Sequence, residues 1–222
     1  MAKQPQYVDE VLELSNLKKW QWPFHIMMHP FEGYENLRWK KSGSMIVAWV
    51  IVFLYFLVQV CDKLFTCFVY NNYTERVFNV VPTIVQTIIL FIAWVVGNWA
   101  VGTFLNGEGS MKNICIFSAY ALVPKIIGDA IAIGMSNIIV ENEEIFMNLI
   151  QIVFTAWTAL LLFMAIKVVH QYKFGETIAA IILTIAAILI MLFLAVLLLS
   201  IFQKLYVFCA TIYTEIVYRF SV

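Results

Sequence analysis

Long apolar stretches alternate with short polar segments along most of the chain. Each stretch holds about 20 residues, which as an α-helix is enough to cross the roughly 30 Å of hydrocarbon in a bilayer. The segments between them contain glycines, charges and amides that favour turns in water. This pattern predicts five membrane-spanning helices, at residues 44–65, 80–102, 114–136, 145–166 and 177–202.

The residues before the first predicted span follow an amphipathic pattern instead. From Tyr7 to Trp20, apolar side chains recur at near-helical spacing with acidic and basic residues between them. Pro23 interrupts this segment, and a second helix can begin near Pro30. Helices of this kind lie flat in the headgroup layer. Residues 1–43 are therefore predicted to form amphipathic helices at a membrane interface.

A narrow polar stripe continues beyond the fifth span, on the aromatic-rich segment 203–222. Its polar side chains are Lys204, Thr211, Glu215 and Arg219. The spacing indicates an amphipathic C-terminal helix, which either lies along the interface or extends the fifth span. The sequence thus predicts an all-α membrane protein with three parts: an N-terminal segment 1–43, a five-helix domain 44–202 and this C-terminal segment.

The composition agrees with a membrane protein. Hydrophobic residues make up 63% of the chain and charged residues 13%, whereas an average soluble domain is about 25% charged. The 14 basic and 14 acidic residues cancel, so the net charge gives no reason to expect nucleic acid as a partner. The lipid bilayer is the partner that the composition itself implies.

The distribution of basic residues predicts the orientation. With a cytoplasmic N-terminus, nine lysines and arginines fall on the cytoplasmic side and four on the other. Because basic residues favour the cytoplasmic side, we expect the N-terminus inside and the C-terminus outside. Six side chains are then expected at the cytoplasmic interface: Trp20, Trp22, Arg38, Trp39, Lys40 and Lys41.

Catalysis, metal binding and cofactor binding are not indicated by any motif. The four cysteines show no CxxC spacing and no histidine cluster near them, which makes metal or redox chemistry unexpected. The HExxH and GxSxG patterns of two large hydrolase groups are absent. We expect a protein without enzymatic activity, metal or cofactor.

Polar residues inside the first four spans recur at intervals of three, four or seven, which places them on one face of each helix. Polar groups in hydrocarbon need partners inside the protein. We therefore expect the four polar faces to meet in a common interior, and the fifth span to be the most exposed to lipid. The predicted intramembrane polar cluster consists of Asn98, Lys125, Asp129, Asn148 and Gln151.

Two of these residues, Lys125 and Asp129, are charged, and each charge costs about 3 kcal/mol at the centre of a spanning helix. They are four residues apart, so their side chains share a helix face and can neutralise each other. One interpretation is a structural pair that holds helices together. The other is a site on a solute or proton pathway, which would need a wet cavity and a charge that changes.

The polar segment before the third span contains GEGS at residues 107–110. Its glycines favour a turn, and Ser110 can cap the helix that follows. A phosphate-binding loop would follow a strand, whereas a membrane helix precedes this segment. We expect a tight connection.

Four segments, read in order, resemble a known family. They are HPFEGYENLRWKKSGS at 29–44, GNW at 97–99, NGEGSMKNI at 106–114 and AYALVP at 119–124. Within five spans, this series resembles the bacterial branch of the Yip-one domain family, the Ypt-interacting membrane proteins. The resemblance implies a five-helix domain in a bacterial cell membrane, with the N-terminus in the cytoplasm and the C-terminus outside.

The same resemblance informs the expected function. Eukaryotic members bind Rab-type GTPases in vesicle traffic, but the short N-terminal segment of this chain departs from their pattern, and GTPase binding is not carried over. Bacterial members are often regarded as neighbours of transport systems. We expect a non-enzymatic protein that contacts lipids or other membrane proteins, an ABC-type transporter among the candidates, as an accessory to transport. The alternative is a small transporter or channel with a polar pathway around Lys125 and Asp129.

Overall fold

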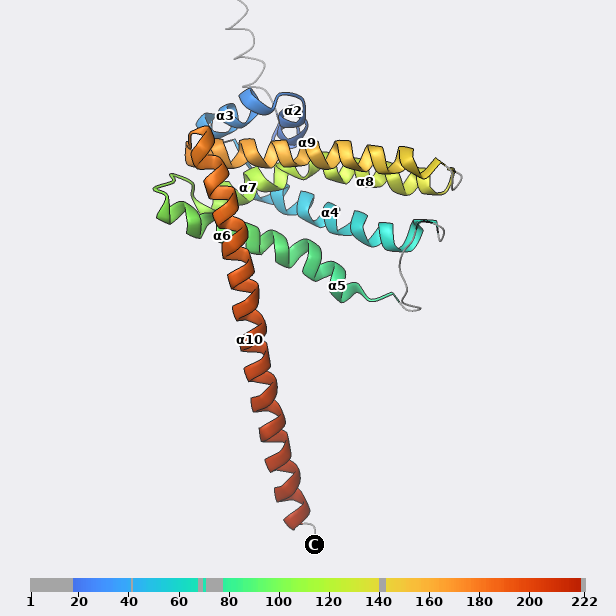
Figure 1. Cartoon of the computed structure of the whole chain (residues 1–222), viewed down its shortest axis with the longest axis vertical. Helices are drawn as coiled ribbons and strands as arrows, with labels where there is room; N and C mark the ends of the chain where they lie inside the picture. Colours follow the sequence, from blue (N-terminus) through green and yellow to red (C-terminus); the bar gives the residue numbers. More distant parts are fainter. Residues whose placement is uncertain (1–17, 41, 68–69, 71–77, 140–142, 221–222) are drawn as a thin grey trace, which may run out of the picture.

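The computed structural model describes residues 18–40, 42–67, 70, 78–139 and 143–220. The secondary-structure elements of this part of the chain are all helices (Figure 1), which confirms the all-α prediction. Most of the amphipathic helix predicted from Tyr7 to Trp20, up to residue 17, lies outside the described residues. The elements follow in the order α2 (Trp22–Met28), α3 (Pro30–Lys40), α4 (Met45–Phe65), α5 (Val80–Ile84), the π-helix η1 (Val85–Ile89), α6 (Leu90–Phe104), α7 (Met111–Ala121), α8 (Val123–Ser136), α9 (Glu144–His170) and α10 (Phe174–Phe220).

Five helical stretches of the described chain are long and apolar enough to cross a membrane, as predicted. They are Met45–Phe65, Val80–Phe104, Met111–Ser136, Glu144–His170 and Phe174–Phe220. The third stretch is divided into α7 and α8 at Leu122. Pro124 explains this division, because proline has no N–H to donate to the carbonyl one turn earlier.

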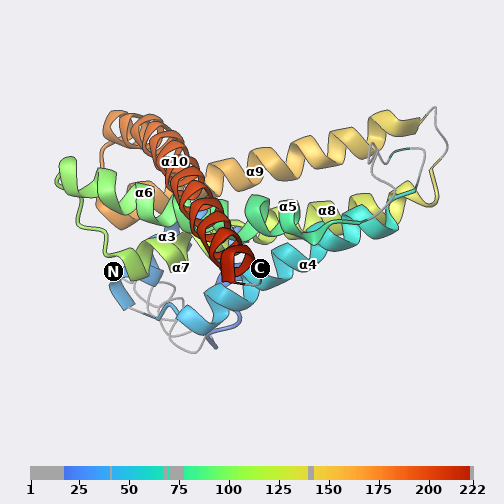
Figure 2. The ribbon, with the colours of Figure 1, turned by 90° about the horizontal axis from the view of Figure 1, so that it is seen from below.

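The first four spans lie side by side and alternate in direction (Figures 1 and 2). Cys67 N donates to Ser136 Oγ at one end of this bundle, where α4 and α8 both finish. At the opposite end, the last turn of α9 meets the connection between α6 and α7. We call this second end the basic end, because it carries Arg38, Lys112, Lys167 and Lys173.

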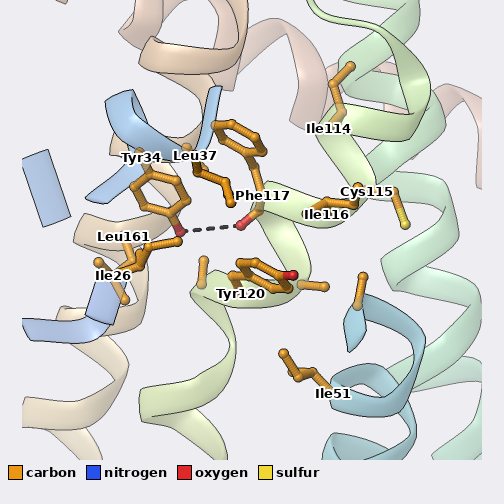
Figure 3. Close-up of a cluster of buried hydrophobic side chains, with 14 of the residues drawn as sticks. Ile26, Tyr34, Leu37, Ile51, Ile114, Cys115, Ile116, Phe117, Tyr120 and Leu161 are labelled. Carbon is orange, nitrogen blue, oxygen red and sulfur yellow. Dashed lines mark hydrogen bonds between the residues drawn. The ribbon is translucent and has the colours of Figure 1, made fainter. Parts of the chain in front are cut away.

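The helix α7 lies at the centre of the bundle, and its residues Ile114 to Ala121 are all buried. The N-terminal pair α2–α3 packs directly onto it (Figure 3). Tyr34 stacks on the ring of Phe117 and donates a hydrogen bond of 3.2 Å to its carbonyl. The inward-facing side chains of α2 and α3 therefore belong to the core of the bundle, while other side chains of the pair stay exposed.

Trp22 shows this most clearly. It was predicted to face the cytoplasmic interface, but its side chain is 1% exposed and packs in the same cluster as Ile26 and Leu37. That prediction was wrong, because α2 turns this indole inward against the bundle while Phe24 and Met28 face outward.

The last helix, α10, differs from the others in length and contacts. At 47 residues it measures about 70 Å, more than twice the hydrocarbon thickness. Its first turns pack on α6, and only Thr177, Ala180 and Thr184 are buried. The helix then leaves the bundle at a steep angle (Figure 1), and every described residue from Phe193 onward is exposed. The fifth span is thus the most exposed of the five, as predicted, and residues 203–220 extend it without a break.

Candidate functional site

A buried polar link joins α4 to α8 through the two charges of the third span. Lys125 Nζ lies 2.6 Å from Asp129 Oδ1, so the structure contains the ion pair that the spacing predicts. Gln59 Nε2 of α4 donates to Asp129 Oδ2 at 2.8 Å. The carboxylate is buried and accepts from both partners, whereas the Lys125 side chain is one-quarter exposed. We call Gln59, Lys125 and Asp129 the carboxylate link.

A second polar link joins three helices near the basic end. His170, the last residue of α9, places Nε2 2.8 Å from Asn98 Oδ1 of α6. The Asn98 amide also donates to Thr184 Oγ1 of α10 at 3.4 Å. All three side chains are buried. The Thr184 hydroxyl donates a hydrogen bond of 2.7 Å to the carbonyl of Ala180. We call His170, Asn98 and Thr184 the histidine link.

The predicted polar cluster is therefore wrong as a single site. Asn98 belongs to the histidine link and does not meet Lys125 and Asp129. Asn148 lies on an exposed face of α9, where it donates to Glu144 of its own helix at 3.3 Å. Gln151 is half-buried and forms no hydrogen bond with the described residues. The physical reason is the position of α7, because its apolar side chains fill the centre where the polar faces were expected to meet.

The GEGS segment at residues 107–110, which we call the glycine segment, does more than connect two spans. The ring of His170 packs so closely against it that a Cβ at Gly107 would lie 2.2 Å from Nδ1, and one at Gly109 2.7 Å from Cε1. Gly102, at the end of α6, is equally close, with 2.4 Å to Cε1. Contacts under 3.0 Å are sterically forbidden, so only glycine fits at these positions beside the ring. Tyr172 stacks on the His170 ring, with ring centroids 5.0 Å apart and planes at 7°, and its hydroxyl also lies close to Gly107.

Ser110 then caps α7 as predicted, accepting a hydrogen bond from the amide of Asn113 at 3.4 Å.

Tyr172 lies in the turn between α9 and α10. Burial, followed by the nearby charge of Glu176, raises the pKa of its phenol. The group stays neutral at physiological pH, which suits its position against the imidazole.

Arg38 connects α3 to the end of α9 and to the glycine segment. Its Nη1 donates to the carbonyls of Val168 and Val169, the latter at 2.6 Å, and its Nη2 lies 2.6 Å from Glu108 Oε2 in the glycine segment. A cation is favourable at the carbonyl end of a helix. Arg38 was predicted from the sequence to face the headgroups, but these contacts turn most of its side chain inward.

The other residues predicted to lie at the cytoplasmic interface are Trp20, Trp39, Lys40 and Lys41. Trp20 and Trp39 are exposed, at 55% and 76%, and Lys40 is exposed beside them. Lys41 lies outside the described residues. Phe31 of α3 also faces outward, and so do two apolar side chains of α2 that were not singled out from the sequence, Phe24 and Met28. Pro23 was interpreted as an interruption, whereas α2 contains it in its first turn and continues to Met28.

Four sequence segments, read in order, resembled a known family. Most of them lie in the α2–α3 pair, the histidine link and the glycine segment. The Yip1 domain model matches residues 24–198 of this chain. The chain belongs to the Yip1 domain family. No curated protein and no solved structure matches it.

Some of the features described above lie within the Yip1 domain match, and others lie outside it. Both polar links, the glycine segment and Arg38 lie inside the match, which ends within α10. Trp20, Trp22 and the last part of α10 lie outside it. The contacts at the basic end are therefore features of the Yip1 domain of this chain, whereas the protruding end of α10 is an addition to it.

Proposed function

We propose that this chain is a non-enzymatic adaptor of a bacterial cell membrane, with its basic end and N-terminus in the cytoplasm and its C-terminus outside. It acts through contacts with other membrane proteins or lipids and serves as an accessory to a membrane transport system. An ABC-type transporter is the partner class that we favour. The excess of basic residues at the end where α2, α3 and α9 meet supports this orientation.

The observation that carries the proposal is the outer surface of α2–α3. Large apolar side chains are exposed on it while the backbone beneath is held in place by Tyr34 and Arg38. We call Phe24, Met28, Phe31 and Trp39 the outer apolar surface; all four are exposed. Exposed apolar surface on a rigid support is typical of an interaction site, because little conformational entropy is lost on binding.

A non-enzymatic role is supported by how the buried polar groups are used. The carboxylate of Asp129 accepts from Lys125 and Gln59, and Asn98 bonds both His170 and Thr184. These hydrogen bonds run between helices, as expected of groups that hold a membrane bundle together, although His170 Nδ1 has no partner among the described residues.

Site-specific crosslinking at native expression level tests the adaptor proposal. A photoreactive residue at Phe31 or Trp39 should capture one defined membrane protein, whereas the same residue at Phe193, exposed on α10, should not. Combined Phe31→Ala and Trp39→Ala substitution should abolish that adduct without changing the thermal unfolding midpoint. Purification in mild detergent that returns this chain alone, together with no protein adduct at either position, would refute the adaptor role.

The second candidate function is a small transporter or channel. The observation that favours it is the ion pair inside the third span, whose Lys125 side chain is partly accessible. In reconstituted vesicles, transport predicts solute or proton flux that disappears in Lys125→Ala and Asp129→Ala while the proteins stay folded. Absence of flux in the wild type, with loss of folding in these variants, would assign the pair to structure alone.

A further inference from the structure

A cavity of about 400 Å³ lies at the basic end, where the N-terminal helices meet the bundle. α3 forms one wall, and the glycine segment, the first turn of α7 and the end of α9 form the others. Its volume lies within the range of about 300–1,000 Å³ that is usual for small-molecule sites. Neither polar link lines it.

The walls of the cavity carry two cations and one acid. Lys112 is exposed and forms no ion pair with the described residues, and Arg38 reaches the cavity from α3. Glu108 lies beside them, bonded to Arg38 through one oxygen while its side chain remains 68% exposed. The charged groups that line the cavity therefore sum to one positive charge, and the Asn113 amide adds a further polar group.

The floor of the same cavity is apolar. Leu37, Ile116 and Phe117 line it, and all three belong to the buried core. Trp39 stands at its edge with most of its indole exposed. Cations, an indole and apolar side chains thus line one cavity, and these are the residue types that contact the headgroup, interface and acyl layers of a lipid.

We propose that this cavity binds the headgroup of an anionic phospholipid from the bilayer. Lys112 and Arg38 face the phosphate, Asn113 binds the headgroup oxygens, and the floor contacts the first carbons of an acyl chain. The single net positive charge matches a phosphodiester, which carries one negative charge, better than a doubly charged phosphate monoester. This site rests on the proposed placement of the basic end at the headgroup layer, but it does not depend on any protein partner.

Native mass spectrometry of the purified full chain in mild detergent tests this site. Phosphatidylglycerol, phosphatidylcholine and glycerol phosphate are added separately, and the lipid-bound fraction is measured for each. We expect phosphatidylglycerol to bind at least about tenfold more tightly than phosphatidylcholine, because both lipids carry the same phosphodiester but only phosphatidylcholine would bring a second cation, its choline group, beside Lys112 and Arg38. Glycerol phosphate should not displace the bound lipid at millimolar concentration.

Lys112→Ala is the decisive variant, since Lys112 is exposed and forms no ion pair with the described residues, so that its loss should leave the fold intact. It should weaken phosphatidylglycerol binding about tenfold, while Lys173→Ala, which removes another exposed cation from the same end, should have no effect. Arg38 is a poor choice because its removal also releases α9 and Glu108. Glu108→Gln should strengthen phosphatidylglycerol binding by removing the competing acid.

Three results would overturn the lipid site. Equal losses in Lys112→Ala and Lys173→Ala would show general attraction to a basic surface. Equal binding of phosphatidylcholine would show that the charge is not recognised. Displacement by glycerol phosphate at millimolar concentration would identify a site for soluble phosphate compounds. None of these measurements involves a protein partner, so they are independent of the crosslinking test of the adaptor role.

Discussion

At the scale of single residues, the polar side chains of the spans act through specific partners. The pairing of Lys125 with Asp129 could be predicted from the sequence, because two costly charges four residues apart on one helix have an obvious way to neutralise each other. The role of Gln59 could not, since its partner is 70 residues away and the order of the helices in the bundle is not encoded in local spacing. The same holds for His170 and Asn98.

The carboxylate link predicts an asymmetry between its two charges. Lys125→Ala leaves Asp129 buried with Gln59 alone, whereas Asp129→Ala leaves a lysine that is partly exposed and can extend toward water. We expect Lys125→Ala to lower the free energy of unfolding in detergent by about 2–4 kcal/mol, Asp129→Ala by less, and the double variant by less than Lys125→Ala. Equal losses in the three proteins would argue against a mutually neutralising pair.

The half-buried His25 of α2 predicts a dependence of stability on pH. Burial, then the neighbouring His29, lowers the pKa of its imidazole below the ordinary value of 6.5, an effect that Glu32 partly opposes. The folded state thus binds its proton less readily than the unfolded state, so stability is complete above pH 6.5 and falls as the pH drops below this value. Unfolding midpoints between pH 8 and 5 should fall less steeply in His25→Gln than in the wild type. Parallel curves for the two proteins would contradict this assignment.

At the scale of elements, the spans were predictable and their packing was not. Apolar length alone fixes where a helix can cross hydrocarbon, so the predicted and observed spans agree closely from Met45 to His170. The packing of α2–α3 on α7 could not be predicted, because an amphipathic helix that packs on a protein and one that lies on a membrane share the same periodicity. The glycine segment was underestimated for a related reason. Nothing near Gly107 in the sequence indicates that His170 will pack against it.

Two glycines of α8 give a matched test of helix packing. A Cβ at Gly128 would lie 2.5 Å from Cβ of Phe154 on α9, whereas one at Gly134 would meet nothing within 4 Å. Gly128→Ala should therefore push α8 and α9 apart and cost about 1–3 kcal/mol of stability. Gly134→Ala should be neutral or slightly stabilising, because alanine favours a helix by about 1 kcal/mol over glycine. Thermal unfolding of both variants in the same detergent compares them directly, and a larger loss in Gly134→Ala would show that this packing is wrong.

At the scale of the whole molecule, the structure is a four-span bundle built around α7, with α10 attached at one side. The N-terminal pair, the end of α9 and the glycine segment converge at the basic end through Arg38. This convergence joins residues that are up to 131 positions apart, which is why the sequence suggested membrane surface chemistry here but no defined site. The proposed adaptor surface and lipid cavity both depend on it.

The attachment of α10 leads to a prediction about the stability of the bundle. Thr184 lies in the histidine link, whereas residues 203–220 are exposed and contribute nothing to the core. Removal of residues 203–222 should therefore leave the free energy of unfolding of the bundle within about 0.5 kcal/mol of the wild type, as for other changes outside packed regions. Thr184→Val keeps the shape of the side chain but leaves the Asn98 amide with one partner fewer, and should cost about 1–3 kcal/mol. Both proteins are compared with the wild type by thermal unfolding in the same detergent. A truncated chain that unfolds as easily as Thr184→Val would mean that the distal part of α10 packs against the bundle, and the separation between a compact domain and a protruding helix would have to be abandoned.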